Sequence, residues 1–375
     1  DWWTKTEYPP VSMNTGLTIA TVSDDTPPLG DTNRSACRSA VSAGFGTNNQ
    51  MPDAVKEVVI DVTTDYISDK LPSLYRVFAI TREYCQAKSP AGILCGVTDS
   101  PEIQVIKQAA SESNTPVVAF QHGGNYGYNW ADKLRFGDLK VPDVFCTWGK
   151  GVTDHLQNRV ETLGTSTELT TLGYAKTDLK PAEGERKQPS ESDTLLYVAT
   201  GLRGDVNYGP GYWHDDTEYY RYQRTLFENL ELVDVSEILF KPHYKDKVSN
   251  PITKDVDSEF DIQTVRSKDL TNHLPDADVV LIDYPSTTLL ETMLAEKPIV
   301  YLDIGWYQWV SEGKQLLSDC VYWINQGDRG WQQALERSVR RALETGPKGS
   351  YQSFLSRYSD PEVDFSSLDD RLFET

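Results

Sequence analysis

The chain has 375 residues, of which 38% are hydrophobic and 11% aromatic, and its formal net charge is -20. This length allows two domains that each bury a core, and the composition is that of a globular rather than a disordered protein. The acidic balance disfavours a general nucleic-acid binder, because phosphate backbones would be repelled; solvation in a salty setting is the alternative reason for it.

The cysteine pattern and the absence of targeting segments indicate the cellular compartment of the protein. Five cysteines are scattered without a CxxC pair, and this odd number is typical of a reducing compartment rather than of a disulfide framework or a zinc site. The sequence has no apolar run of 18 residues and no signal peptide. We therefore expect a cytoplasmic protein, either free or peripheral at the inner face of the membrane. The chain begins with Asp1 rather than Met, which is compatible with a domain excised from a larger synthase.

The N-terminal half alternates predicted strands and helices after a loop-rich start. Residues 1–50 lack a periodic pattern, and we expect loops there with one strand at 17–22. Residues 55–68 have a helical or mixed pattern, and 74–86 carry a helical apolar face. The following segments are predicted strands at 93–97, 116–121, 144–148 and 169–173, with helices at 102–111 and 152–160.

A polar segment with two prolines and a glycine, 175–194, is the predicted linker. It separates an N-terminal domain, 1–174, from a C-terminal domain, 195–345, and a tail at 346–375 is expected to pack back on the N-terminal domain. The C-terminal pattern predicts strands at 195–199, 237–241, 260–265, 279–282 and 299–302, with helices at 218–230 and 331–343. The expected fold class is α/β, with two Rossmann-like domains facing across a cleft.

The C-terminal half contains a β-turn-α-β unit at 276–303 with three hydroxyls at the start of its helix, Ser286, Thr287 and Thr288. A helix N-terminus offers free N–H groups and partial positive charge, so these residues predict a phosphate site. The alternative is an ordinary N-cap. Asp283 is placed to fix the loop, and Glu291 to reach a ribose or sugar hydroxyl; the alternative for Glu291 is a solvated helix residue. Both are counted among the donor- or acceptor-binding residues.

A second turn follows the strand predicted at 116–121 and begins Gln121-His122-Gly123-Gly124. Glycines directly after a strand let the backbone approach a ligand, so Gly123 and Gly124 are candidate binding residues. They also leave room around His122, whose neutral imidazole could accept a proton from an acceptor hydroxyl. The alternative for His122 is a structural hydrogen bond within the turn.

Two further loops of the C-terminal half carry candidate phosphate ligands. The strand at 237–241 ends in Lys241-Pro242-His243, which brings a fixed cation and a titratable donor to the edge that bears the hydroxyls. Gly201 and Arg203 follow the strand at 195–199 and could present N–H groups and a guanidinium to a diphosphate, although the loop is not GxGxxG. No HExxH, no GxSxG and no DxD followed by a partner acid is present, and no metal site is predicted.

Together these motifs resemble those of GT-B-fold transferases of bacterial surface polysaccharides. The similar groups are the O-antigen and capsule transferases with a QHGGxYG signature and the CDP-glycerol glycerophosphotransferases of teichoic acid synthesis. The resemblance covers about residues 90–150 and 195–303. It implies His122 as the acceptor-side catalytic residue, His243 as a donor phosphate ligand and Ser286–Thr288 as the donor phosphate cradle. The Pro242-His243 order differs from the usual His-Pro, which leaves the donor open between a nucleotide sugar and a CDP-alditol.

We therefore predict a transferase that moves a glycosyl or alditol-phosphate group from a CMP-, CDP- or UDP-linked donor to a hydroxyl of a growing surface polysaccharide, with glycosyl transfer favoured. His122 and His243 are the predicted catalytic residues, and Arg203, Lys241 and the helix N-terminus stabilise the departing phosphate without a required cofactor. The expected partners are the donor, a saccharide or lipid-linked acceptor and other domains of a larger synthase. Two rivals stay open: a sugar-nucleotide epimerase on the same fold and a non-catalytic carbohydrate-binding module.

Overall fold

The structure, a computed structural model, describes residues 31–45, 53–96, 100–129, 136–174, 193–202, 216–243, 251–266, 269–360 and 362. The strand predicted at 17–22 and most of the linker predicted at 175–194 lie outside these residues, so the domain division stays a prediction. Within the described ranges, no helix combines the length and the apolar character needed to cross a bilayer.

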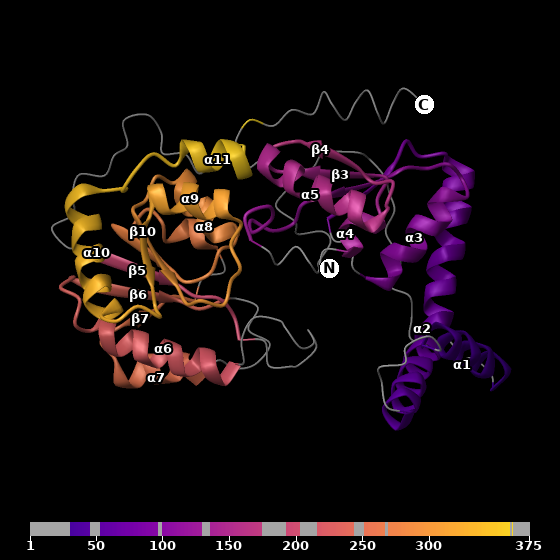
Figure 1. The fold of residues 1–375 in the computed structure, drawn as a ribbon, viewed down its shortest axis with the longest axis horizontal. Helices are drawn as coiled ribbons and strands as arrows, with labels where there is room; N and C mark the ends of the chain where they lie inside the picture. The colour runs from indigo at the N-terminus through magenta and orange to yellow at the C-terminus, as the bar shows by residue number, and fades with distance from the viewer. Residues whose placement is uncertain are drawn as a thin grey trace.

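The N-terminal half contains a four-stranded parallel sheet with the strand order β1-β2-β3-β4. Each strand therefore pairs with its neighbour in the sequence. Its strands β3 and β4 are labelled in Figure 1. The strands are β1 (Ile93–Cys95), β2 (Val117–Phe120), β3 (Val144–Thr147) and β4 (Glu168–Thr171), and the helices are α1 (Asp31–Phe45), α2 (Asp53–Lys88), α3 (Pro101–Ser111), α4 (Phe136–Lys140) and α5 (Lys150–Leu163). All four residues of β3 are buried, as a strand covered on both faces requires.

α2 is one continuous helix of 36 residues, where the sequence pattern predicts two separate segments. Pro72 lies inside it, and a proline within a helix removes a backbone hydrogen bond. Both α1 and α3 pack against α2, and Arg34 and Arg38 of α1 form ion pairs with Asp65 and Asp61 of α2. Packing against these neighbours offsets the cost of Pro72.

The C-terminal half contains a six-stranded parallel sheet with the order β10-β9-β8-β5-β6-β7. The chain builds β5, β6 and β7 in one direction and then returns to place β8 on the other side of β5. The strands are β5 (Thr194–Val198), β6 (Glu237–Lys241), β7 (Gln263–Thr264), β8 (Val279–Ile282), β9 (Ile299–Asp303) and β10 (Tyr322–Asn325). The helices are α6 (Asp216–Leu230), α7 (Pro251–Glu259), the 3-10 helix η3 (Leu270–Asn272), α8 (Thr287–Leu294), α9 (Ser311–Cys320), α10 (Trp331–Thr345) and α11 (Gln352–Tyr358).

Alternating residues of the C-terminal strands bury two different faces of the sheet. Leu195 and Tyr197 of β5 pack with α6, α7 and α10, whereas Leu196 and Val198 pack with α8 and α9. The cluster that contains α8 continues into the N-terminal half through residues such as Tyr126. The two halves therefore share one apolar core.

The predicted α/β class with parallel sheets is confirmed. The strands predicted at 237–241 and 279–282 coincide with β6 and β8. The strand predicted at 260–265 is wrong over most of its length, because only Gln263–Thr264 pair, at the edge of the sheet. The sequence pattern also missed α9 and β10; β10 is a four-residue edge strand with alternating burial, too short for a clear signal.

The segment after β2, residues 121–129, packs against the C-terminal half. Val310 N donates to Tyr128 O at 3.0 Å, and Asn129 forms an isolated antiparallel bridge with Trp309. The ring of Tyr128 stacks on that of Trp309, with the centroids 6.1 Å apart. Backbone and aromatic contacts thus join this segment to the connection between β9 and α9.

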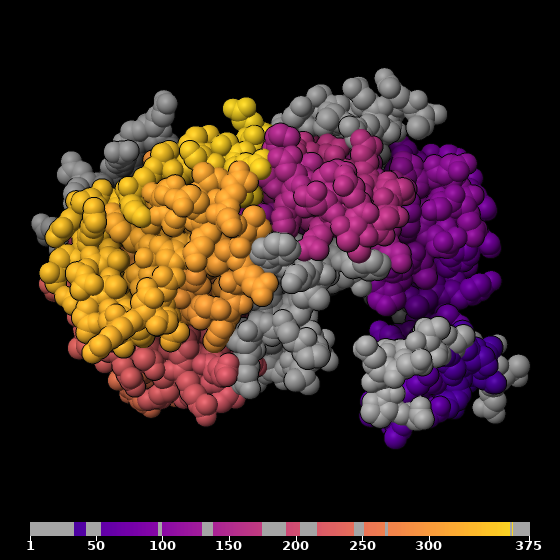
Figure 2. All heavy atoms as spheres, in the orientation of Figure 1, coloured from indigo at the N-terminus to yellow at the C-terminus, as the bar shows by residue number. Residues whose placement is uncertain are grey.

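The last described helix, α11, contacts α5 of the N-terminal half. Directly after it, Asp360 N donates to Trp148 O (2.8 Å) and Asp360 O accepts from Tyr174 N (2.6 Å). Gly149 permits this close packing, because a Cβ there would lie 2.6 Å from Arg357 O. In Figure 2 the yellow C-terminal segment meets the magenta part of the N-terminal half.

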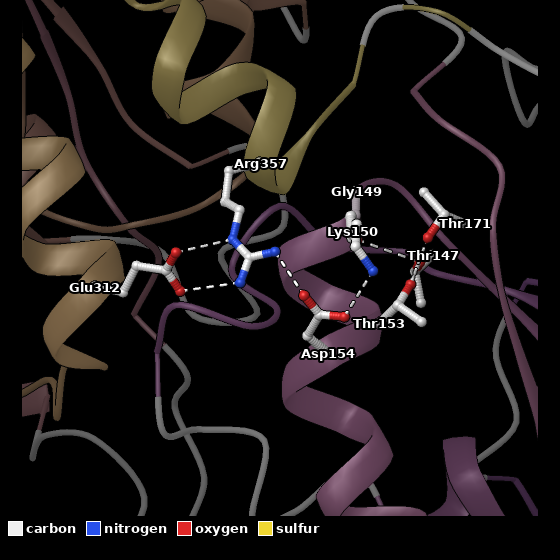
Figure 3. A network of polar contacts seen from close by, with 8 residues as sticks. All are labelled: Thr147, Gly149, Lys150, Thr153, Asp154, Thr171, Glu312 and Arg357. Carbon is white, nitrogen blue, oxygen red and sulfur yellow. Dashed lines mark hydrogen bonds and ion pairs between the residues drawn. The ribbon is translucent and has the colours of Figure 1, made fainter.

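Arg357 on α11 pairs with carboxylates from both halves (Figure 3). Its Nε and Nη2 donate to the two oxygens of Glu312 on α9, both at 3.0 Å, and Nη1 donates to Asp154 on α5 at 2.7 Å. The hydrogen bond from Arg357, with help from Lys150, lowers the pKa of Asp154. Because the Arg357 side chain is only 27% exposed, water screens this network less than it screens an ordinary surface pair.

We expect Arg357→Ala to lower the free energy of unfolding by about 1–2 kcal/mol. A half-buried arginine that bonds one carboxylate with two nitrogens and a second carboxylate with a third stabilises a fold more than an exposed ion pair does. Urea unfolding measures the loss. Arg340→Ala is the matched control: Arg340 forms an exposed pair with Glu336 one helical turn away, and its removal should cost less than about 0.5 kcal/mol. Equal losses in the two variants would contradict a special role for Arg357.

Candidate active site

The loops after β5 and β8 lie where the C-terminal sheet reverses its direction of growth. β5 pairs with β8 on one side and with β6 on the other, all parallel, so these loops share one edge of the sheet. Open parallel sheets bind ligands at their carboxyl edge beside such a switch point. The predicted phosphate turn, which starts at Asp283, and the loop that contains Gly201 therefore occupy the expected position.

The three hydroxyls at the start of α8 make different contacts. Ser286 is the N-cap, and its Oγ accepts from Thr288 N at 3.3 Å, so the capping alternative holds for this residue. Its Oγ also lies 2.6 Å from Thr288 Oγ1. The hydroxyl of Thr287 instead accepts a hydrogen bond from Gly124 N of the N-terminal half, at 3.2 Å.

Gly124 packs directly on the first turn of α8. A Cβ at Gly124 would lie 2.7 Å from Thr287 N, 2.8 Å from Thr287 Cα and 2.9 Å from Leu290 Cδ1. Any larger residue would force the two segments apart. The two turns singled out by their sequences, whose contacting residues are 163 positions apart, thus meet at the N-terminus of α8.

The buried side chain of Gln121 holds the turn that carries His122 through two hydrogen bonds. Gln121 is 1% exposed; its Nε2 donates to Gly123 O at 2.8 Å, and its Oε1 accepts from Trp148 N at 2.9 Å. His122 itself is exposed, and its Nδ1 lies 3.1 Å from the hydroxyl of Tyr126. The predicted structural hydrogen bond within the turn is present, and it leaves the imidazole at the surface.

Lys241 is a buried cation among acidic groups. The residue is 5% exposed, and burial lowers its pKa, an effect opposed by the charges of Asp269 and Glu291. Glu291 is 7% exposed, so the solvated alternative for this residue is wrong. Burial, and then the charge of Lys241, lower the pKa of His273. Asp269 and His273 were not predicted, because neither belongs to a sequence motif.

The remaining predicted ligands differ in how far the structure describes them. His243 follows β6 and is exposed, whereas Gly201 is buried in the loop after β5. Arg203 lies outside the described residues. In the part of the chain that the structure describes, no group of three or more His, Cys, Asp or Glu residues could hold a metal ion.

Asp283, predicted both to fix the loop and to belong to the donor- or acceptor-binding residues, lies wholly inside the core at 0% exposed. Its Oδ2 accepts from the hydroxyls of Tyr197 (2.6 Å) and Tyr219 (3.0 Å). The hydroxyl of Tyr219 in turn accepts from Thr200 N at 3.0 Å. Asp283 therefore ties the loop after β8 to the loop after β5, as a residue that positions the site. Sequence could indicate a loop-fixing acid but not its buried tyrosine partners.

The chain is similar to known transferases in sequence. Residues 23–317 match the LIC12162 family transferase. No curated protein matches the chain.

The chain is similar to solved structures at low identity. A structure assigned as a UDP-N-acetylglucosamine 2-epimerase from Listeria monocytogenes has a TM-score of 0.50 at 14% identity, over 80% of this chain and 79% of that one. A glycosyltransferase from Rickettsia africae has a TM-score of 0.48 at 12% identity, over 76% and 77%. Anabaena HepE, solved in complex with UDP, has a TM-score of 0.47 at 11% identity, over 91% and 95%. The likeness to the Listeria structure confirms the predicted fold, a GT-B-like pair of Rossmann-like domains.

The buried carboxyl of Asp283 should make stability depend on pH. Burial raises its pKa to about 6, although hydrogen bonds oppose this rise, whereas an aspartate in an unfolded chain has a pKa of about 3.9. The folded state therefore holds this proton more tightly. The contribution of Asp283 to stability is complete below the unfolded pKa and is lost as the pH rises through the folded pKa.

We expect the wild type to lose about 1 kcal/mol of unfolding free energy relative to Asp283→Asn between about pH 5 and about pH 7.5, because only the wild type must ionise a buried carboxyl over this range. Urea unfolding of both proteins at the two pH values measures the difference. A difference that does not change with pH would contradict the raised pKa.

Proposed function

The chain belongs to the LIC12162 family of transferases, and from this premise we propose that it transfers a glycosyl group from a nucleotide-activated donor to a hydroxyl of a saccharide or lipid-linked acceptor. The C-terminal half binds the donor through its phosphates, and the N-terminal half presents the acceptor. Transfer of an alditol phosphate from a CDP-linked donor is the second form of this proposal. The motif resemblance supports a surface polysaccharide as the acceptor, and five free thiols support a reducing compartment.

One contact carries the proposal. Gly124 N donates to Thr287 Oγ1 at 3.2 Å, so the turn with the candidate base touches the turn with the candidate phosphate site. A transfer reaction needs these two functions side by side, because the acceptor oxygen must reach the carbon that the phosphate leaves. A module that only bound carbohydrate would not need an anion site next to an exposed histidine.

The donor side supplies fixed positive potential. The N-terminus of α8 carries partial positive charge, and the Lys241 ammonium lies at the carboxyl end of β6, two strands away from β8. His243 follows directly after Lys241-Pro242 and is exposed to a ligand. These groups would stabilise the charge that develops on the departing phosphate.

The acceptor side supplies a base. As the acceptor hydroxyl attacks the donor, its oxygen forms a bond to the transferred group and its proton passes to the His122 imidazole. The bond between the transferred group and the phosphate breaks, and the nucleotide leaves with the bonding electrons. The reaction therefore needs only the donor, the acceptor hydroxyl and the imidazole.

We expect His122→Ala to lower kcat by about 100-fold or more, because general-base catalysis contributes about 10²–10⁴, while nucleotide binding is retained. Thermal shift with UDP, CDP and CMP names the donor class, and transfer from the matching activated donor then measures kcat. His155→Ala on α5 is the control histidine outside the turn and should stay close to the wild type.

Other outcomes would oppose the proposal. Full activity of His122→Ala would show that His122 is not the general base. A protein that no nucleotide stabilises would favour the non-catalytic binding module. Conversion of a sugar nucleotide into its epimer without an added acceptor would favour the epimerase.

A further inference from the structure

His122 is connected through Tyr126 to a buried acid. The Tyr126 hydroxyl lies 3.1 Å from His122 Nδ1 and donates to Asp138 Oδ2 at 2.6 Å. Tyr126 is 0% exposed and Asp138 is 4% exposed, whereas His122 is at the surface. A buried carboxylate, a buried phenol and an exposed imidazole therefore form one chain that leads from the core to the candidate site.

The donors and acceptors in this chain fix the position of the imidazole proton. An ionised carboxylate can only accept, so the single hydroxyl proton of Tyr126 points to Asp138. The phenol oxygen can then only accept from His122, which requires the proton of the neutral ring to be on Nδ1. Nε2 is then the basic nitrogen. Burial, and then the charge of Asp138, raise the pKa of the Cys95 thiol.

We propose that Tyr126 and Asp138 are positioning residues that hold His122 in the Nδ1–H tautomer, so that Nε2 takes the proton of the acceptor hydroxyl. This inference rests on the proposed function for its role in catalysis, but the tautomer itself does not. When Nε2 gains the proton, the ring becomes cationic, and the carboxylate of Asp138 stabilises that charge through the Tyr126 hydroxyl.

The fold of the turn supports this assignment. Gly127 has a φ of +80°, and a Cβ there would lie 2.8 Å from Val152 Cα, so the chain bends back tightly over α5 directly after Tyr126. The Tyr126 ring packs on Phe145 of β3, with the centroids 6.2 Å apart. The phenol is held by packing, and its hydroxyl has little freedom to leave Asp138.

The tautomer can be measured without any activity. In the full chain labelled with 15N at histidine, long-range proton–nitrogen spectra distinguish Nδ1–H from Nε2–H, and His122→Gln identifies the His122 signals among the five histidines. We expect Nδ1–H in the wild type. In Asp138→Asn the amide can donate to the Tyr126 oxygen, so the hydroxyl proton turns to His122 Nδ1 and the ring changes to Nε2–H.

Two more variants separate this effect from misfolding. Tyr126→Phe keeps the ring but removes the link, and the preference for Nδ1–H should be lost. Tyr128→Phe removes the hydroxyl of another fully buried tyrosine two residues away and should keep the wild-type tautomer. Nε2–H in the wild type, or Nδ1–H retained in both Tyr126→Phe and Asp138→Asn, would overturn the inference.

Activity then tests the catalytic part. Asp138→Asn and Tyr126→Phe should lower kcat by about 10- to 100-fold with the donor KM unchanged, and the acidic limb of the pH profile should move to lower pH as the imidazolium loses its counter-charge. If the tautomer behaves as expected while His122→Ala keeps full activity, the proposed function fails and the hydrogen-bond assignment stands. If His122→Ala is inactive and Nδ1–H is retained in both Tyr126→Phe and Asp138→Asn, the hydrogen-bond assignment fails and the proposed function stands.

Discussion

The contact between Gly124 and the first turn of α8 is the constraint on which the candidate site depends. It joins backbone to backbone so closely that a single added methyl group would lie 2.7 Å from Thr287 N. The need for glycine here comes from packing, whereas at Gly127 it comes also from a φ of +80°. Without this contact, the turn that carries His122 and the first turn of α8 would not form one site. The position of residues 121–129 therefore determines the geometry of both turns.

Buried polar groups hold the loops that meet at this contact. Asp283 accepts from Tyr219, which accepts from Thr200 N, and this pair of hydrogen bonds joins the two loops at the switch point of the C-terminal sheet. Gln121 does the same in the N-terminal half by bonding both Gly123 and Trp148. Burial makes a lost partner costly, so these side chains are expected to restrict the loops to one arrangement.

Local patterns made the strands and the two turns predictable, because a buried run of residues such as Val279–Ile282 and a glycine or hydroxyl cluster are properties of adjacent residues. Partners from distant segments were not predictable. The carboxyl of Asp283 was expected near a ligand, but its tyrosine partners come from β5 and α6. The link from Tyr126 to Asp138 likewise depends on where α4 packs, which no spacing in the sequence indicates.

The three hydroxyls at the start of α8 make different hydrogen bonds, and these bonds limit how an anion can bind. Ser286 caps Thr288 N, and Thr287 accepts from Gly124, so the first turn of the helix is already occupied on the side that faces the N-terminal half. A phosphate bound at this turn would lie beside Gly124, two residues from His122. Phosphate position and base position would then be set by the same contact, since moving the turn away from α8 would move both.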